Sequence, residues 1–187
     1  MLREFAPSDA AGLRYQSDAR YLTYYPWESR SAEDVRDFVQ MFLDWQAEAP
    51  RWRWQLAIVP DAATGIATGI AAGMVGNCGL RLDAPGARTG NIGYELDPEV
   101  WGHGYATEAA QEMLRFGFEE LGLHRAWSWC IADNTRSRAV LERLGMRLEG
   151  QQREHEEFKG RWWDHCLYGL LADEWRARGD SRLEVGS

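Results

Sequence analysis

The residues that could do chemistry are two glycines one residue apart, Gly102 and Gly104, with His103 between them. They follow an alternating, strand-like run that stops at Asp97-Pro98, and a helix-like sequence begins directly after them at Tyr105. A strand, a glycine turn and a helix start together present a row of backbone N–H groups, and the helix N-terminus adds partial positive charge. This arrangement predicts a site for a phosphate group.

The turn by itself does not identify the phosphate compound. A dinucleotide-binding fingerprint would require a third glycine at position 107, where the chain has Thr107. The phosphate-binding loop of nucleoside triphosphatases would supply a lysine followed by serine or threonine, which is missing here. In isolation, two glycines before a helix are more typical of an ordinary turn than of a binding site.

Composition limits the classes of function. The net charge of −8 argues against nonspecific binding to nucleic acid or to an anionic membrane, and it fits either a cationic partner or solubility alone. The three cysteines are far apart and form no Cys-x-x-Cys pair, so we expect neither a disulfide framework nor a metal site. No targeting signal or stretch of membrane-spanning length is present, so we expect a cytoplasmic protein.

Hydrophobic periodicity and turn residues predict the elements that position the glycine turn. Strands are expected at residues 2–5, 51–59, 74–82, 91–96, 125–132, 147–158 and 161–171. Helices are expected from Ser8 or Asp9, from Ser31, from Tyr105 to a stop at Gly122, and over residues 134–144, with a last turn at 173–178. Residues 64–73 read as a flexible hairpin connection. We therefore predict one α+β domain over residues 1–178, with a mostly antiparallel sheet, and a mobile tail at 179–187.

Two further segments allow more than one interpretation. Residues 21–30 carry many aromatic side chains around Pro26, which favours core packing over the lining of a pocket. The closing hairpin carries a group of acidic residues that could attract an amine or could form a solvated face, the second being the simpler reading. These acidic residues are Glu154, Glu156, Glu157 and Asp164.

Two motifs stand at a specific spacing along the chain. The first comprises Ile92-Gly93-Tyr94-x-Leu96, Pro98 and Trp101-Gly102-x-Gly104-Tyr105-Ala106-Thr107-Glu108-Ala109. The second comprises Asn134-x-x-Ser137 and Leu144-Gly145-Met146, and further matches are Leu2-Arg3, Asp9, Gly160, Trp162, Asp164 and Tyr168. Together they resemble the GNAT N-acetyltransferase superfamily, in the branch that contains the ribosomal-protein N-acetyltransferases. The likeness covers nearly the whole chain.

The resemblance implies acetyl-coenzyme A (acetyl-CoA) as cosubstrate and a GNAT-like fold, in which helices flank a mixed, mostly antiparallel and splayed sheet. The pyrophosphate would lie on a turn whose residues are Trp101, Gly102, His103, Gly104, Tyr105, Ala106 and Thr107. The pantetheine arm would run along the strand edge at residues 94–96. The resemblance also places the Leu96 N–H at the oxyanion, Asn134 beside the arm and Ser137 near the sulfur.

One departure from the superfamily pattern affects the catalytic residues. Many members have a tyrosine seven residues after the motif asparagine as the acid for the departing thiolate, and this chain has Leu141 there. Ser137 is then the candidate acid, with an ordinary first-turn hydroxyl as the equally weighted alternative. Glu95 is the candidate base, and the equally weighted alternative is an ordinary strand glutamate that faces solvent. Glu108 is less suited to this role, because a glutamate in the first turn of a helix stabilises the helix dipole without any catalytic function.

The expected reaction is direct attack of a primary amine on the thioester, because no serine or cysteine has a nucleophile–base pattern. The branch resemblance favours a protein or peptide N-terminus as acceptor, with a small cationic amine (a polyamine or an aminoglycoside) as the alternative. A catalytically silent acyl-CoA-binding module and a nucleotide-binding module are rival readings. Exposed tryptophans near Trp162 would allow a homodimer.

Overall fold

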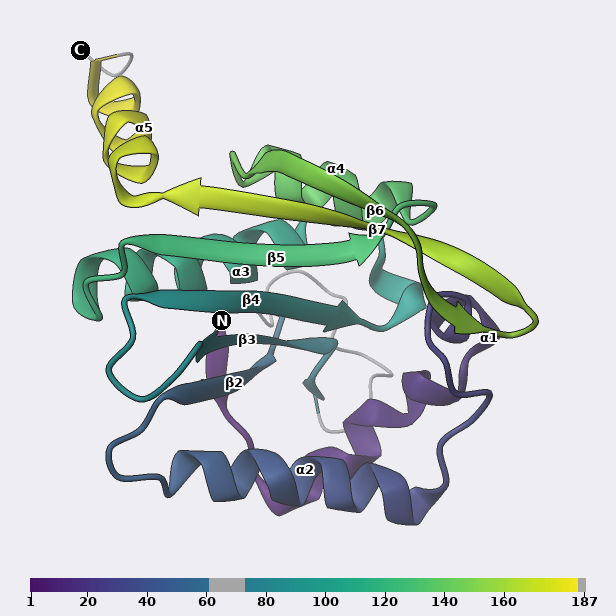
Figure 1. The fold of residues 1–187 in the computed structure, drawn as a ribbon. Helices are drawn as coiled ribbons and strands as arrows, with labels where there is room; N and C mark the ends of the chain where they lie inside the picture. The colour runs from purple at the N-terminus through teal and green to yellow at the C-terminus, as the bar shows by residue number, and fades with distance from the viewer. Residues whose placement is uncertain (61–72, 185–187) are drawn as a thin grey trace.

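A computed structural model describes the backbone of residues 1–60 and 73–184 (Figure 1). Apart from Gly73, the connection predicted at residues 64–73 lies outside this part of the chain. Within it, seven strands form one sheet in the order β1-β2-β3-β4-β5-β7-β6. The strands are β1 (Leu2–Glu4), β2 (Arg53–Ile58), β3 (Gly76–Leu82), β4 (Thr89–Leu96), β5 (Arg125–Ile131), β6 (Arg147–Phe158) and β7 (Arg161–Leu171).

Strand pairing confirms the predicted fold class. Each neighbouring pair is antiparallel except β4 and β5, which run parallel. The parallel pairing covers only the first residues of both strands, from Thr89↔Arg125 to Asn91↔Trp127. Just beyond it, the buried Ser128 Oγ donates to the carbonyl of Ile92 at 2.8 Å. The sheet therefore splays open toward the carboxyl ends of β4 and β5, where a ligand can enter.

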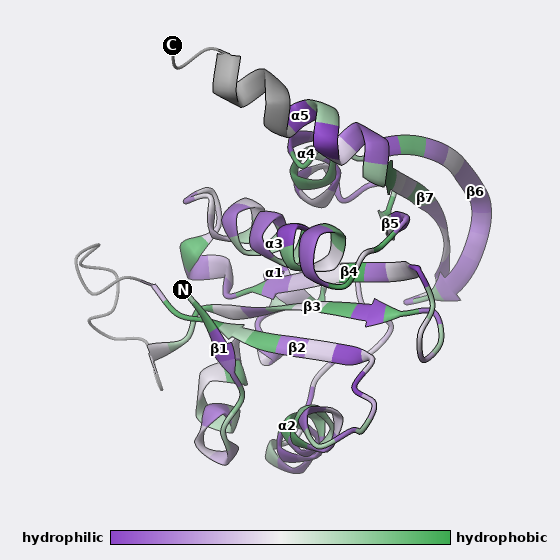
Figure 2. Ribbon diagram, turned by 90° about the vertical axis from the view of Figure 1, so that its left-hand side faces the viewer, coloured by the Kyte–Doolittle hydropathy of each residue, from purple (hydrophilic) through white to green (hydrophobic). Residues whose placement is uncertain are grey.

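Helices cover both faces of the sheet. In chain order they are η1 (Pro7–Ser17), α1 (Ala19–Leu22), α2 (Ala32–Gln46), η4 (Pro98–Val100), α3 (Tyr105–Arg115) with its continuation η5 (Phe116–Glu120), α4 (Thr135–Arg143) and α5 (Ala172–Glu184). Figures 1 and 2 show α3 and α4 on one side of the central strands and α2 on the other. Because strand side chains alternate between faces, each strand contributes to both sides.

The described residues form three hydrophobic cores, and the two larger ones follow from this layering. On the α3/α4 side, Leu80 and Ile92 of the sheet pack with Leu114 and Leu141 of the helices, all at 0% exposure. On the α2 side, a separate core joins η1, α1 and α2 to the first strands, with the buried Leu13 and Phe42 among its members. The α2-side core contains no residue of β4 or β5. Apart from Ile131, which packs with Phe158 and Trp163 in the third core, this leaves one face of these two strands available for a site.

Of the predicted starts of the first two long helical segments, the start of α2 is confirmed and the start of η1 is wrong. Ser31 caps α2, and its hydroxyl accepts from the Asp34 N–H while the Asp34 carboxylate accepts from the Ser31 N–H. The earlier cap at Ser8 or Asp9 is wrong, because η1 begins one turn sooner with Ala6 as its N-cap. The Asp9 carboxylate reaches back to the Ala6 N–H at 2.8 Å and pairs with Arg3. Asp9 thus fixes the corner between β1 and η1.

The C-terminal part of the chain follows the expected hairpin. Strands β6 and β7 have the predicted bounds and turn at Lys159 and Gly160. Helix α5 continues to Glu184, beyond the end expected at residue 178, while the mobility of the tail stays a prediction. Trp162 is 51% exposed and Trp163 is buried, so one tryptophan of this pair remains on the surface. A homodimer through this surface stays a prediction. No helix in the described residues is long and apolar enough to cross a membrane.

Candidate active site

The glycine turn has the backbone conformation that a cradle for a phosphate requires. Gly102 and Gly104 have φ angles of +85° and +87°, in the left-handed region that favours glycine, and Gly104 is the N-cap of α3. Gly102, Gly104, Ala106 and Thr107 line a cleft at this helix start. The free N–H groups of the first helical turn and the absence of side chains on the glycines fit a pyrophosphate.

Two residues predicted for the same turn lie outside the cleft lining. The His103 ring turns back, with Nδ1 at 3.2 Å from the Val100 carbonyl oxygen, and Tyr105 packs against the α3-side core. Neither is among the residues that line the cleft. The His103 and Tyr105 side chains therefore point away from the cleft, and a contact of their backbone N–H groups with the cosubstrate stays a prediction.

Trp101 and Leu96 shape the edge of β4 at the open end of the sheet. The Trp101 indole donates to the Leu96 carbonyl at 3.1 Å, and the Arg136 guanidinium lies 4.8 Å from the centre of its ring. The next residue, Asp97, donates its N–H to Val75 beside β3. Because N–H directions alternate along an antiparallel strand, the Leu96 N–H points to the opposite side, into the gap next to β5. This is the direction that an oxyanion donor requires.

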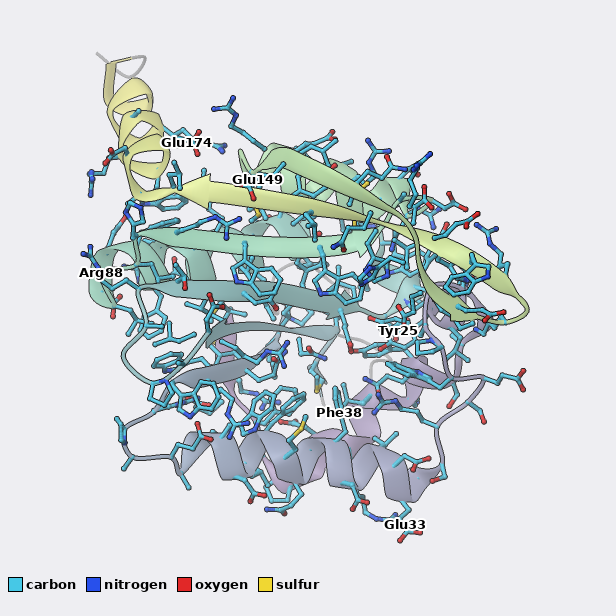
Figure 3. The ribbon with its side chains drawn as sticks, in the orientation of Figure 1. Tyr25, Glu33, Phe38, Arg88, Glu149 and Glu174 are labelled. Atoms are coloured by element: carbon cyan, nitrogen blue, oxygen red, sulfur yellow. The ribbon has the colours of Figure 1, made fainter. Side chains whose placement is uncertain are left out.

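The cleft has a volume of about 960 Å³ and passes through the splayed part of the sheet. On the α3/α4 side it is lined by the glycine turn and the start of α4, and on the other side by residues of α2 and of the 21–25 segment. Figure 3 shows Tyr25 and Phe38 in the space between α2 and the sheet. Openings on both faces would let two substrates approach the gap from opposite sides.

The second motif meets the first across the gap. Asn134 caps α4, with its Oδ1 accepting from the Ser137 N–H at 3.1 Å, and both residues line the cleft. The Tyr94 hydroxyl lies 3.0 Å from Ser137 Oγ and donates to the Ser137 carbonyl at 3.0 Å. Burial raises the pKa of Tyr94, so this phenol stays protonated at neutral pH. The motif alone did not identify Tyr94 as the hydroxyl partner of Ser137.

We predict that Ser137→Ala lowers kcat about tenfold, because a proton donor near the departing sulfur is lost while the Tyr94 hydroxyl remains. The helix cap should survive, since Asn134 bonds the backbone of residue 137 and not its hydroxyl. Steady-state kinetics with saturating acetyl-CoA would measure the change, and Tyr94→Phe would show which hydroxyl contributes more. An unchanged kcat in Ser137→Ala would leave this serine with a structural role only.

Glu95 lies on the opposite face of β4 from Tyr94, toward α2, and lines the cleft. Its carboxylate accepts three hydrogen bonds, from Gln16 Nε2 at 3.0 Å, Asn77 Nδ2 at 3.3 Å and the Tyr25 hydroxyl at 3.2 Å. Burial and the nearby Glu95 charge raise the pKa of Tyr25, so Tyr25 is a donor at neutral pH. These donors orient the carboxylate at the entrance to the gap. Glu108, the other carboxylate considered for this role, is not among the lining residues.

The aromatic segment at residues 21–30 both packs in the core and lines the cleft. Tyr21 is a core residue at 5% exposure, stacked on Tyr25 with ring centres 4.5 Å apart, and Tyr25 in turn stacks on Trp27. Tyr21 and Tyr25 also line the cleft. Core packing, the favoured sequence interpretation, is therefore correct but incomplete. A sequence signal for the second role was the density of aromatics around Pro26.

The acidic hairpin residues do not line the cleft. Glu156 pairs with His165 at 3.1 Å, while Asp164 accepts from the Gln151 side chain and from the Glu154 N–H. The simpler reading, a solvated hairpin face, fits these contacts better than a role in binding the acceptor. Gln16, Tyr25 and Asn77, which do surround Glu95, escaped the sequence reading because they are far from it along the chain.

Comparison with known proteins gives the family and the same fold. Residues 1–147 match the family described as acetyltransferase (GNAT) domain, so the chain belongs to the GNAT acetyltransferase family. It is 39% identical over 176 residues to an uncharacterized N-acetyltransferase, YnaD, of Bacillus subtilis (strain 168), covering 94% of this chain and 95% of that protein. It is 30% identical over 84 residues to the ribosomal protein uS5 alanine N-acetyltransferase of Escherichia coli (strain K12), and this match covers 45% of this chain and 43% of that protein.

Solved structures show the same architecture. A GNAT-family acetyltransferase from Bacillus anthracis has a TM-score of 0.75 at 30% identity and covers 92% of this chain and 95% of its own. A spermidine N-acetyltransferase from Vibrio cholerae also has a TM-score of 0.75, covering 94% and 96%, but at 16% identity it shows the fold alone. The protein is an acetyl-CoA-dependent N-acetyltransferase, and the described residues contain no group suited to a metal ion.

Proposed function

We propose that the enzyme acetylates the α-amino group of a protein or peptide by direct attack on the thioester, with Glu95 as the base. The observation that supports this most is the charge of the cleft. Among its described lining residues Glu95 is the one carboxylate, whereas Arg20, Arg81, Arg136 and Arg143 are cationic. A polyamine or an aminoglycoside carries several positive charges and would need several carboxylates. A chain terminus presents a single ammonium group, which one carboxylate can match.

The described side chains divide the reaction between the two faces of the sheet. Toward α2, Glu95 can take a proton from the arriving ammonium group, directly or through water. In the gap, the Leu96 N–H can stabilise the oxyanion. Toward α4, Ser137 and Tyr94 can supply a proton to the departing thiolate. Acetyl-CoA provides the acetyl group and its thiol leaves.

Direct attack is also supported by the state of the cysteine at the site. Cys130 lines the cleft, and burial raises the pKa of its thiol to about 11. The thiolate, which is the nucleophilic form, is therefore scarce at neutral pH. Cys78 and Cys166 are buried and do not line the cleft. A covalent acyl-cysteine step has no suitable group, and the free, buried cysteines fit the proposed location in the cytoplasm.

A test is thiol release from acetyl-CoA in the presence of defined amines. We expect a peptide with a free α-amino group to stimulate release, and the same peptide with a blocked N-terminus and an internal lysine to do so at least tenfold less. Stimulation by spermidine or an aminoglycoside alone would overturn the proposed acceptor. Tight acetyl-CoA binding without stimulation by any amine would instead indicate a silent binding module.

A further inference from the structure

On the α2 side of the sheet, the floor of the cleft is built from three cross-strand pairs of β3 and β4. Asn77 lies opposite Glu95, Gly79 opposite Gly93, and Arg81 opposite Asn91, and all of these residues line the cleft. In an antiparallel ladder, facing residues two apart point to the same side. A carboxylate therefore stands at one end of this floor and a guanidinium at the other, and the pair of β3 and β4 between them, Gly79 and Gly93, has no side chain of its own.

The middle of the floor is open above Gly93, whereas the Gln55 side chain covers Gly79. A Cβ atom added at Gly93 would meet no heavy atom within 4 Å, so the space above this residue belongs to the cleft. At Gly79 this space is filled by the Gln55 side chain of β2, because an added Cβ would lie 2.1 Å from Gln55 Oε1. Opposite this floor, α2 contributes Phe38, Met41 and Trp45 to the lining. The result is a flat track between the two strands and an apolar helix face.

Arg81 has a charge that the surrounding protein does not neutralise. Among the described side chains it forms no ion pair, and its contacts include Asn91 Oδ1 at 3.5 Å and the Trp45 ring, 5.9 Å from its Cζ. Its cross-strand neighbour is another arginine, Arg53, which pairs with Glu48. The nearest acidic residue along the chain, Asp83, directly follows β3 and accepts from the Trp127 indole at 2.8 Å and from the Thr89 hydroxyl.

We infer that Arg81 binds an anionic group of the acceptor while the amine of the same molecule lies at Glu95, an inference that rests on the proposed acetylation of a peptide amine. Asn91, the partner of Arg81, lies four positions before Glu95 on β4, which corresponds to about 14 Å. An extended peptide advances roughly 3.3–3.6 Å per residue, so an acidic side chain at about the third or fourth position would reach Arg81. A free amino acid is too short to span both ends.

This local cation matters because the whole chain is acidic. A net charge of −8 disfavours the approach of an anionic acceptor, so recognition needs a nearby positive group to outweigh it. Arginine is suited to this task, since its planar guanidinium bonds a carboxylate through two parallel N–H groups. Arg20, the other arginine on the acceptor side, is already held by Asp18 and Glu99.

The test uses hexapeptides with a free N-terminus that differ only in carrying Glu or Gln at position three or four. For the wild-type enzyme we expect the Glu peptides to have a KM about tenfold lower, because they form charge-assisted hydrogen bonds to Arg81. Arg81→Gln should remove this difference and Arg81→Lys should keep part of it. Arg20→Gln is the matched control and should preserve the preference. Gly93→Val should raise the KM of every peptide without changing that of acetyl-CoA.

A binding measurement separates this inference from the proposed function. Nα-acetylated Glu and Gln peptides, titrated against the enzyme with coenzyme A present, should bind with the same preference even without turnover, and Arg81→Gln should abolish it. If no free peptide is acetylated, the proposed function fails. Equal affinities for the Glu and Gln peptides in the wild type, or a preference that survives Arg81→Gln, would overturn the role of Arg81.

Discussion

Glu95→Gln is expected to lower kcat by about 10²–10⁴-fold, with the KM of acetyl-CoA unchanged. The reason is that an α-amine with a pKa of about 7.7–8.0 is largely protonated at neutral pH and must lose a proton before it can attack. Glutamine keeps the shape of the side chain: its amide oxygen can accept from Gln16 and Asn77, and its amide N–H can donate to the Tyr25 hydroxyl, so the site should stay assembled. Only the capacity to take a proton is removed.

The pH profile distinguishes a base from a structural residue. In the variant, the fraction of amine that is neutral limits the rate, and this fraction grows as pH rises through the pKa of the amine. Activity of Glu95→Gln should therefore recover partly at pH 9 relative to the wild type. Glu108→Gln is the matched control, because Glu108 stands in the first turn of α3 outside the cleft lining. Unchanged turnover and an unchanged pH profile in Glu95→Gln would exclude Glu95 as the base.

Gly104→Ala is expected to weaken the binding of acetyl-CoA about tenfold. A residue with a Cβ in the left-handed region costs roughly 1–2 kcal/mol, and Gly104 has a φ of +87° at the N-cap of α3. Relief of this strain would turn the first N–H groups of the helix away from the pyrophosphate. Isothermal titration with coenzyme A would measure the loss directly.

Gly122→Ala provides the control for general destabilisation. Gly122 has a similar φ of +68°, follows η5 rather than beginning a helix, and has no heavy atom within 4 Å of an added Cβ. It lies outside the cleft lining. Both variants should lose a comparable amount of stability in thermal unfolding, but only Gly104→Ala should lose affinity for coenzyme A. Equal affinity in the two variants would show that the glycine turn does not hold the phosphates.

Residue types and spacing were sufficient to predict the elements on the proposed cosubstrate side, because each of these elements depends on residues that are close together in sequence. The run from Tyr94 through Gly104 is continuous in sequence, and its strand, turn and helix are each determined by neighbouring residues. The second motif, from Asn134 to Gly145, is also one continuous helix with its cap. The closing hairpin had the predicted bounds for the same reason, since its turn and alternation are local signals.

The surroundings of Glu95, on the proposed acceptor side, were decided by the tertiary structure. Glu95 is surrounded by Gln16, Tyr25 and Asn77, which come from parts of the chain distant from it and are brought together by the packing of η1, the segment after α1, and β3. The track from Glu95 to Arg81 exists only through the register of β3 against β4. Register depends on which faces are buried, so it cannot be read from either strand separately. The two motifs together thus indicate the acetyl donor from sequence, whereas the cross-strand register determines what lies on the proposed acceptor side.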